Sequence, residues 1–283
     1  MKTRLPPWLK VPFPGGQNFL QVSRLLREKE LHTVCQEARC PNIGECFEAK
    51  TATFLILGDV CTRSCRFCAV APGHPSPPDL GEAQRVAQAA AALGLRYVVV
   101  TSVTRDDLPD GGAGLFATTI AAIRESSPGT QVEVLIPDFG GSTEPLETVM
   151  AAHPTVLSHN VETVPRLYPR VRPRASYHRS LELLGRAAGG GMTAKSGLML
   201  GLGEEKEEVF QTMADLREQG CHILTLGQYL RPSPSHLPVE RFYTPEEFQG
   251  LGHLAQGMGF IHVESGPLVR SSYHAHLQAI CLP

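Results

Sequence analysis

Three closely spaced cysteines form the most chemically distinctive stretch of the sequence. Cys61, Cys65 and Cys68 follow a C-x3-C-x2-C pattern. The pattern comes directly after the apolar run TATFLILGDV, so we expect it to form a loop at the C-terminal end of a strand. Iron–sulfur clusters are ordinarily held by cysteine thiolates, four for a complete set. Three thiolates would hold three irons of a four-iron cubane and leave the fourth iron open to an outside ligand.

An open iron is what binding and reductive cleavage of S-adenosylmethionine require, because its amino and carboxylate groups take that position. The spacing, with the aromatic Phe67 just before the third cysteine, resembles the signature of the radical S-adenosylmethionine superfamily. We therefore expect Phe67 to lie beside the cofactor. The alternative is a zinc knuckle, but zinc sites favour paired C-x2-C units with four ligands. The triplet thus indicates a [4Fe-4S] cluster.

A second triplet, Cys35, Cys40 and Cys46, has the spacing C-x4-C-x5-C. Beside the first triplet it suggests an auxiliary [4Fe-4S] cluster whose fourth ligand comes from elsewhere. The two remaining cysteines are isolated. Cys221 begins a strand-like run and is expected to be a small buried apolar residue. For Cys281 we expect no metal-binding role.

The overall composition excludes several classes of protein. The 283 residues are 42% hydrophobic and 19% charged, which suits one large globular domain. The net charge of −2 gives no general basic footprint for nucleic acid. There is no long apolar run, so we expect no membrane span. The segment Met1–Gly16 has no apolar stretch typical of a secretory signal, so the cysteines are expected in the reducing cytoplasm.

Strand-like and helix-like segments alternate through the rest of the chain, which predicts βαβ units and a parallel sheet. The expected strands are Thr53–Leu57, Tyr97–Thr101, Val132–Ile136, Val156–Ser158, Gly197–Leu200 and Ile223–Leu226. The expected helices are Phe19–Glu30, Gly81–Leu93, Leu115–Glu125, Ser180–Ala188, Glu205–Gln219 and Thr244–Met258.

Periodicity alone does not separate an open doubly wound sheet from a barrel, although both place function at the carboxyl ends of the strands. We adopt an α/β fold, a partial (βα)6 TIM-like barrel with N-terminal and C-terminal extensions. Residues 1–50 would form an N-terminal arm carrying the auxiliary-cluster cysteines. Residues 51–260 would form the core, and residues 261–283 a C-terminal extension.

The chain as a whole resembles the lipoyl synthase family, from Leu5-Pro-Pro-Trp8 to Arg270-Ser-Ser-Tyr-His-Ala275. The pairing of the two triplets with a C-terminal RSSY motif is highly specific, and stretches such as VVTSVTRDD, VEVLIPDF, SHNVETV and KSGLMLGLGE also look like that family. The resemblance implies insertion of two sulfur atoms, at C6 and C8 of an octanoyl chain on a carrier-domain lysine. Each insertion would consume one S-adenosylmethionine as the source of a 5′-deoxyadenosyl radical.

The resemblance also implies that the auxiliary cluster donates the sulfur and takes a serine ligand from the RSSY motif. That serine is Ser271 or Ser272, and we favour Ser272; Arg270 would cover the cluster. Without the family, RSSY would be read as a turn whose hydroxyls bond nearby backbone. The implied partners are octanoylated carrier domains, namely 2-oxoacid dehydrogenase E2 subunits or the glycine cleavage H protein, and an electron donor such as ferredoxin or flavodoxin.

Two other functions compete with this interpretation. One is a different radical enzyme, such as a biotin-synthase-like sulfurtransferase or a methylthiolating enzyme, against which the RSSY motif argues. The other is a non-enzymatic iron–sulfur protein for electron transfer or sensing. A two-cluster ferredoxin would carry the dense C-x2-C-x2-C-x3-C run twice, and this chain does not.

Contacts to S-adenosylmethionine are predicted from the ends of the strand-like runs. Glu133 and Asn160 are candidates for the ribose hydroxyls or the amino group, and Lys195 for the carboxylate. The run holding Gly201 and Glu204 resembles the superfamily strand that packs near the adenine, where glycines permit close approach. Ordinary polar pairing, or a buried strand with a glycine turn, is the alternative for each of these residues.

Five arginines lie close together between Arg166 and Arg179, and they could contact a partner protein. This basic stretch would dock an acidic carrier domain by electrostatic complementarity, or form a solvated loop without a partner. Its arginines are Arg166, Arg170, Arg172, Arg174 and Arg179.

Overall fold

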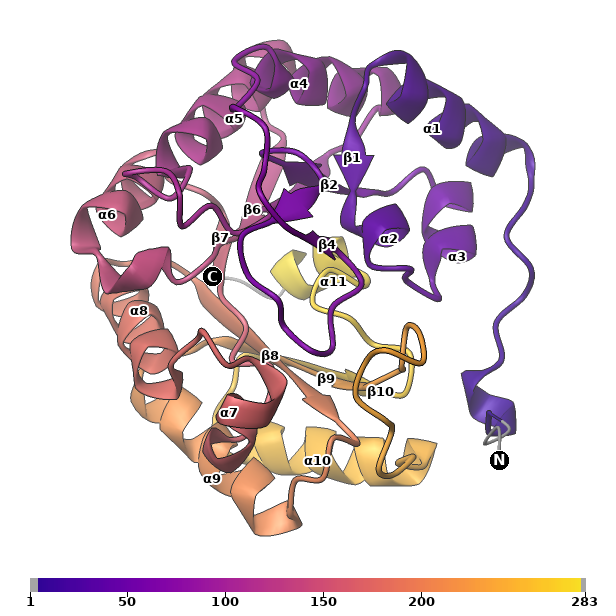
Figure 1. Ribbon diagram of the computed structural model, residues 1–283, viewed down its shortest axis with the longest axis vertical. Helices are drawn as coiled ribbons and strands as arrows, with labels where there is room; N and C mark the ends of the chain where they lie inside the picture. Colours follow the sequence, from indigo (N-terminus) through magenta and orange to yellow (C-terminus); the bar gives the residue numbers. More distant parts are fainter. Residues whose placement is uncertain (1–4, 281–283) are drawn as a thin grey trace.

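An eight-stranded sheet forms the frame of the molecule in the computed structural model, which describes residues 5–280 (Figure 1). In spatial order the strands are β1 (His32–Thr33), β2 (Thr53–Ile56), β5 (Tyr97–Ser102), β6 (Gln131–Leu135), β7 (Val156–Ser158), β8 (Ala194–Leu200), β9 (Ile223–Gln228) and β10 (His262–Gly266). All neighbours pair in parallel except β1, which runs antiparallel to β2. The strands β3 (Val60–Cys61) and β4 (Ala71–Pro72) form a separate small sheet.

The predicted partial α/β barrel is confirmed, and each of the six expected strands is present. Sequence analysis missed β10, which extends the sheet beyond residue 260 into the segment assigned to the C-terminal extension. Its sequence, HVESG, is half-buried throughout, so it shows neither an apolar run nor a clear alternation. The proposed boundary at 260 therefore falls just before a strand of the sheet.

Helices surround the outer face of the sheet (Figure 1). The longer ones are α1 (Gln17–Glu28), α4 (Glu82–Leu93), α5 (Ala113–Ser126), α6 (Thr143–Ala151), α8 (Tyr177–Gly189), α9 (Lys206–Glu218) and α10 (Pro245–Gly257). The shorter ones are α2 (Val34–Glu37), α3 (Ile43–Glu48), α7 (Tyr168–Val171) and α11 (Ala275–Ile280), with 3₁₀ turns at Pro7–Leu9, Phe139–Gly141 and Pro165–Leu167. The predicted start of α10 is confirmed, since Thr244 caps it in a capping box with Glu247.

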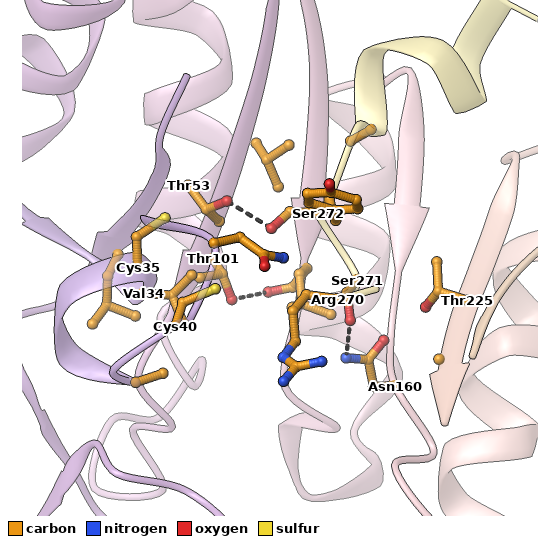
Figure 2. A pocket seen from close by; sticks show the side chains of 18 of the residues that line it. Val34, Cys35, Cys40, Thr53, Thr101, Asn160, Thr225, Arg270, Ser271 and Ser272 are labelled. Atoms are coloured by element: carbon orange, nitrogen blue, oxygen red, sulfur yellow. Dashed lines mark hydrogen bonds between the residues drawn. The ribbon is translucent and has the colours of Figure 1, made fainter. Parts of the chain in front are cut away.

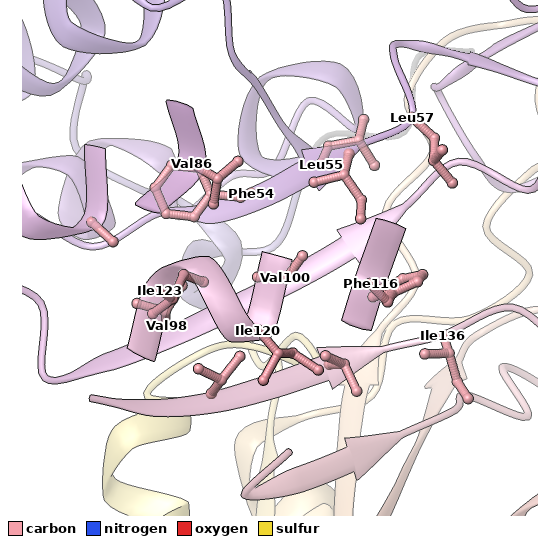
Figure 3. Close-up of a cluster of buried hydrophobic side chains, with 14 of the residues drawn as sticks. Phe54, Leu55, Leu57, Val86, Val98, Val100, Phe116, Ile120, Ile123 and Ile136 are labelled. Carbon is pink, nitrogen blue, oxygen red and sulfur yellow. The ribbon is translucent and has the colours of Figure 1, made fainter. Parts of the chain in front are cut away.

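Alternate residues of each strand face opposite sides of the sheet, and this alternation positions the site. Phe54 of β2 and Val98 and Val100 of β5 point outward and pack against α4 and α5, as Figure 3 shows. The residues between them, such as Leu55 and Val99, line the interior cavity instead. The outward apolar core thus holds the strands in place while the inner face stays available for chemistry.

The C-terminal tail runs into the interior of the partial barrel. Helix α11 packs against β5 and β10, strands that are far apart in the order of the sheet. Gly227 of β9 makes room for the tail, because a Cβ there would lie 2.1 Å from the carbonyl oxygen of Val269. Along residues 5–280, no helix is long and apolar enough to cross a membrane.

Candidate active site with two cysteine triplets on one cavity

One cavity of about 1190 Å³ receives both cysteine triplets. It lies inside the partial barrel, and its wall also includes the tail residues Arg270, Ser271 and Ser272. Phe67 and Asn160 line it as well. The structure therefore brings together the cysteines, the RSSY motif and two of the predicted cofactor contacts.

The first triplet occupies the loop that follows β2. The Cys61 sulfur accepts backbone N–H groups from Arg63, at 3.4 Å, and from Thr104, at 3.3 Å. Burial raises the pKa of Cys65, and it raises that of Cys68 to about 12. The neighbouring cysteines raise the pKa values of Cys65 and Cys68 further, because negative charges on adjacent sulfurs repel one another. A cationic group held between them would offset that repulsion.

The second triplet comes from the N-terminal arm. Cys35 lies in α2, Cys46 in α3, and Cys40 in the turn between them. Burial, with a smaller effect of the other cysteines of the triplet, raises the pKa of Cys35 to about 12 and that of Cys46 to about 11. Burial also raises the pKa of Cys40, and the Arg270 guanidinium acts against that rise.

The donor sets fit clusters better than single metal ions. Within the described part of the chain, no three Cys, His, Asp or Glu side chains converge on a position for one metal ion. A four-iron cubane spreads its cysteine ligands over separate irons, so it needs no such convergence. Each triplet also leaves one iron without a cysteine, and near the second triplet Ser272 offers an oxygen.

The two serines of the RSSY motif point to different ends of the cavity (Figure 2). Ser272 Oγ accepts a hydrogen bond of 2.7 Å from Thr53 Oγ1, and Thr53 lies beside Cys35, whose pKa it lowers against the effect of burial. Ser271 Oγ instead accepts one of 2.5 Å from Asn160 Nδ2. Ser272 is therefore the serine on the side of the second triplet.

Sequence analysis missed two ionic residues of the cavity wall, Glu162 and Arg172. Asn160 Nδ2 donates to Glu162 Oε1 at 3.1 Å, and Arg172 Nη1 donates to the Asn160 carbonyl at 2.8 Å. Asn160 Oδ1 and Arg172 Nε are buried and have no hydrogen-bond partner among the described residues. Buried polar atoms are normally paired, so these two indicate a polar ligand. Arg172 was counted with the surface arginines because composition does not reveal its burial.

Four predicted cofactor contacts, Glu133, Lys195, Gly201 and Glu204, do not line the cavity. Lys195 Nζ lies 2.7 Å from Glu133 Oε1, and both side chains are fully buried. The Glu204 carboxylate accepts the backbone N–H groups of Gly201 and Leu202. Each of these groups already has a partner within the chain, so the geometry does not support the predicted contacts.

The basic stretch is likewise paired within the chain. Arg166 binds Glu208, Arg170 binds Glu240, and Arg179 binds Asp138. Arg174 donates to the Thr62 carbonyl at 2.8 Å. These contacts and the burial of Arg172 leave Arg166, Arg170 and Arg174 as the exposed arginines of the stretch, and docking of an acidic carrier domain stays a prediction.

Replacing Lys195 with methionine is expected to lower the free energy of unfolding by about 3–5 kcal/mol, because Glu133 would be left as a buried unpaired charge. Chemical denaturation of the cluster-free chain measures this. Methionine in place of the exposed Arg170, which pairs with Glu240, should cost less than about 1 kcal/mol. If Glu133 and Lys195 do not touch S-adenosylmethionine, its KM will not change in the folded Lys195→Met protein. A raised KM would restore the original prediction.

Comparisons with known proteins agree with this arrangement. The model of the radical SAM superfamily matches residues 55–216, and that of the N-terminal domain of lipoyl synthase matches residues 1–40. Lipoyl synthase from Rubrobacter xylanophilus is 58% identical over 275 residues, which cover 96% of this chain and 86% of that protein. Lipoyl synthase from Nitrosococcus oceani is 59% identical over 281 residues, covering 98% and 87%.

Solved structures share the fold at low identity. Streptococcus suis SuiB bound to precursor peptide SuiA superposes with a TM-score of 0.58 at 12% identity, covering 80% of this chain and 52% of that one. Coproporphyrinogen III oxidase from Escherichia coli, a radical SAM enzyme, gives 0.52 at 15%, covering 75% and 55%. The chain spans about half the length of these two structures, so they bear on the fold alone.

The family models, the identities over nearly the whole chain and the fold lead to one conclusion. The chain belongs to the lipoyl synthase family, the radical SAM sulfurtransferases of lipoate biosynthesis, which use S-adenosylmethionine and a [4Fe-4S] cluster.

Proposed function

We propose that this chain inserts two sulfur atoms, at C6 and C8, into an octanoyl group held on a lysine of a carrier domain. The auxiliary cluster would donate the sulfur. The observation that carries the proposal is the meeting of both cysteine triplets and Ser272 on one cavity. A radical generated at one end of that cavity and a sulfur source at the other end would share a single substrate space.

Cys61, Cys65 and Cys68 would hold the cluster that binds S-adenosylmethionine. When bound, these groups supply the 5′-deoxyadenosyl radical that removes a substrate hydrogen. The unpaired polar atoms of Asn160 and Arg172 lie in the same wall and are suited to orient the polar part of S-adenosylmethionine. Burying these groups also keeps water away from the reacting centre.

Cys35, Cys40, Cys46 and Ser272 would hold the auxiliary cluster. Thr53 already donates a hydrogen bond to Ser272 Oγ, which stabilises negative charge on that oxygen and favours the deprotonated form that a ligand needs. Arg270 lies near Cys40 and Glu162, between the two ends of the cavity. Its charge would offset that of the thiolates on the auxiliary side.

The octanoyl chain would occupy the apolar part of the cavity wall. Leu55, Val99, Leu135 and Met199 line the cavity from four strands. Apolar surface of this kind binds a saturated chain by removing it from water. The polar groups at the two ends leave this middle section as the place for an eight-carbon chain.

The proposed partners follow from this substrate. Octanoylated domains of 2-oxoacid dehydrogenase E2 subunits or of the glycine cleavage H protein would deliver the octanoyl group, and a ferredoxin or flavodoxin would supply electrons. We place the reaction in the cytoplasm. The proposed division of labour is an arm of residues 1–50 for the auxiliary cluster, a core of residues 51–260 for radical formation, and residues 261–283 for the serine.

An anaerobic turnover experiment tests the proposal. The chain is reconstituted with iron and sulfide, then given dithionite, S-adenosylmethionine and an octanoyl-lysine peptide. We expect mass spectrometry to detect 5′-deoxyadenosine together with singly and then doubly thiolated peptide. Deoxyadenosine with an unchanged peptide would point to another radical enzyme. If neither product forms on a protein that holds both clusters, the enzymatic proposal is wrong.

A further inference from the structure

The loop that follows β5 lies along the loop of the first cysteine triplet and is bonded to it repeatedly. Thr62 donates twice to the Thr104 carbonyl, through its backbone N–H and its hydroxyl, both at 3.0 Å. Thr104 N–H donates to the Cys61 sulfur, and Asp106 N–H donates to Thr62 Oγ1 at 3.1 Å. Backbone and sulfur of the cysteine loop are therefore fixed to a neighbouring loop that itself holds no cysteine.

Arg63 adds an ionic clamp to these hydrogen bonds. Its guanidinium is buried and contacts Asp106 through both Nε and Nη2, at 2.9 and 2.7 Å. The same Nη2 lies 2.6 Å from Asp138 Oδ1, at the end of β6. Although burial would raise the pKa of Asp138, the Arg63 guanidinium holds it at about 2, so this carboxylate stays charged. A two-pronged contact between arginine and carboxylate fixes orientation as well as distance.

The start of the cysteine loop is held in the same manner. Leu57 adopts a left-handed backbone with φ of 69°, and Gly58 follows with φ of 88°. The Leu57 N–H donates to Glu82 Oε2 at 2.7 Å, and its carbonyl accepts from Arg105 Nη1 at 3.4 Å. A leucine in this conformation is strained, and it persists only where surrounding groups determine it. Arg105 belongs to the loop that also supplies Thr104 and Asp106.

We infer that Asp106, acting through Arg63, is a positioning residue that fixes the loop of Cys61, Cys65 and Cys68. The inference rests on the proposed function in that this loop holds the cluster with the open iron. The three half-buried cysteines are kept together by hydrogen bonds and ion pairs that come mostly from the loop after β5, from Arg63 and from Asp138.

The remaining contacts of the clamp define the variants to compare. In Asp106→Ala, Arg63 keeps only Asp138, and the two-pronged contact is lost. In Asp106→Asn, one oxygen can still accept from Arg63, so the effect should be intermediate. The matched control is Glu208→Ala, which removes the equally two-pronged but exposed contact with Arg166, together with the hydrogen bond from the Glu205 N–H that caps α9, away from the cavity.

The experiment follows cluster loss from the reconstituted full chain. Absorbance of an iron(II) chelator under anaerobic conditions gives the rate of iron release. Electron paramagnetic resonance of the reduced protein, with and without S-adenosylmethionine, reports on the open-iron cluster. We expect Asp106→Ala to release iron from this cluster about tenfold faster than wild type, the lower end of what lost support around metal ligands costs. The fraction of cluster that responds to S-adenosylmethionine should fall, while Glu208→Ala behaves as wild type.

Thermal unfolding of the cluster-free proteins separates positioning from general instability. We expect Asp106→Ala and Glu208→Ala to lower Tm by similar amounts. If Asp106→Ala fails to fold, Asp106→Asn takes its place. Iron release from Asp106→Asn at the wild-type rate would overturn the inference. The inference would also be overturned if Asp106→Ala released iron at the same rate as Glu208→Ala and gave the same electron paramagnetic resonance signal. The proposed function would be unaffected by that result. A wild-type chain whose cluster does not respond to S-adenosylmethionine would overturn both.

Discussion

Replacement of Cys65 by alanine is expected to abolish formation of 5′-deoxyadenosine, and with it every sulfur-containing product. The Cys65 thiol lines the cavity beside the other two cysteines of its triplet. With two thiolates left, the loop offers too few ligands to hold a cubane with one open iron. Liquid chromatography with mass spectrometry, on anaerobically reconstituted protein, measures both products.

Cys221→Ala provides the matched control for this loss. The Cys221 side chain is fully buried in the second apolar core and lies outside the cavity wall. Burial raises the pKa of its thiol to about 12, as expected for a residue that serves only packing. Turnover by the folded Cys221→Ala protein should match wild type. Deoxyadenosine produced by Cys65→Ala at the Cys221→Ala rate would refute the assignment of the first triplet.

Replacement of Ser272 by alanine is expected to separate the two halves of the reaction. The serine contacts Thr53 and lies near Cys35, at the auxiliary end of the cavity. Its loss removes the oxygen proposed as the fourth ligand there but leaves the first triplet intact. We expect 5′-deoxyadenosine to form still, while thiolated peptide falls to background and iron content drops to about half. Iron analysis and mass spectrometry on one preparation give all three values.

Ser271→Ala is the neighbouring control and decides between the two serines. Its hydroxyl bonds Asn160, so the variant should retain the auxiliary iron and alter S-adenosylmethionine binding instead, seen as a raised KM. The opposite pattern would assign the ligand to Ser271. Full dithiolation by Ser272→Ala would show that the auxiliary cluster needs no serine.

Features that depend on local spacing were predictable from sequence. The cysteine triplets, the six strands and the capping box at Thr244 each involve residues within a few positions of one another. The sequence did not show which side chains pair with each other across the sheet. Glu133 and Lys195 were each predicted to face the cofactor, because no local pattern shows that β6 and β8 bring them within 2.7 Å.

The close approach predicted for the glycine-containing strand illustrates the same limit. A Cβ on Gly197 would lie 2.5 Å from Thr225 Oγ1 and 3.4 Å from Ser271 Oγ, so space is indeed short at this strand. The groups that come close are the chain's own side chains, first Thr225 of the neighbouring strand and then Ser271 of the tail, 74 residues after Gly197. Gly201 is packed against Gln228 and the Arg241 carbonyl and faces no cavity. The sequence indicated that glycines were needed in this strand, and only the tertiary structure showed which groups pack against them.

The path of the tail has a consequence for the order of events during protein synthesis. Asn42 donates to the Leu268 carbonyl, Thr53 to Ser272, and Tyr273 to Glu45, so residues made early meet residues made much later. A ribosome releases the N-terminal cysteines long before it reaches the serine, and chains fold from the N-terminus as they emerge. The hydrogen bonds of the first triplet's loop reach partners that are made earlier than the tail, such as Thr104, Asp106, His236 and Leu237. Newly made chains should therefore become competent for the first cluster before they become competent for the second.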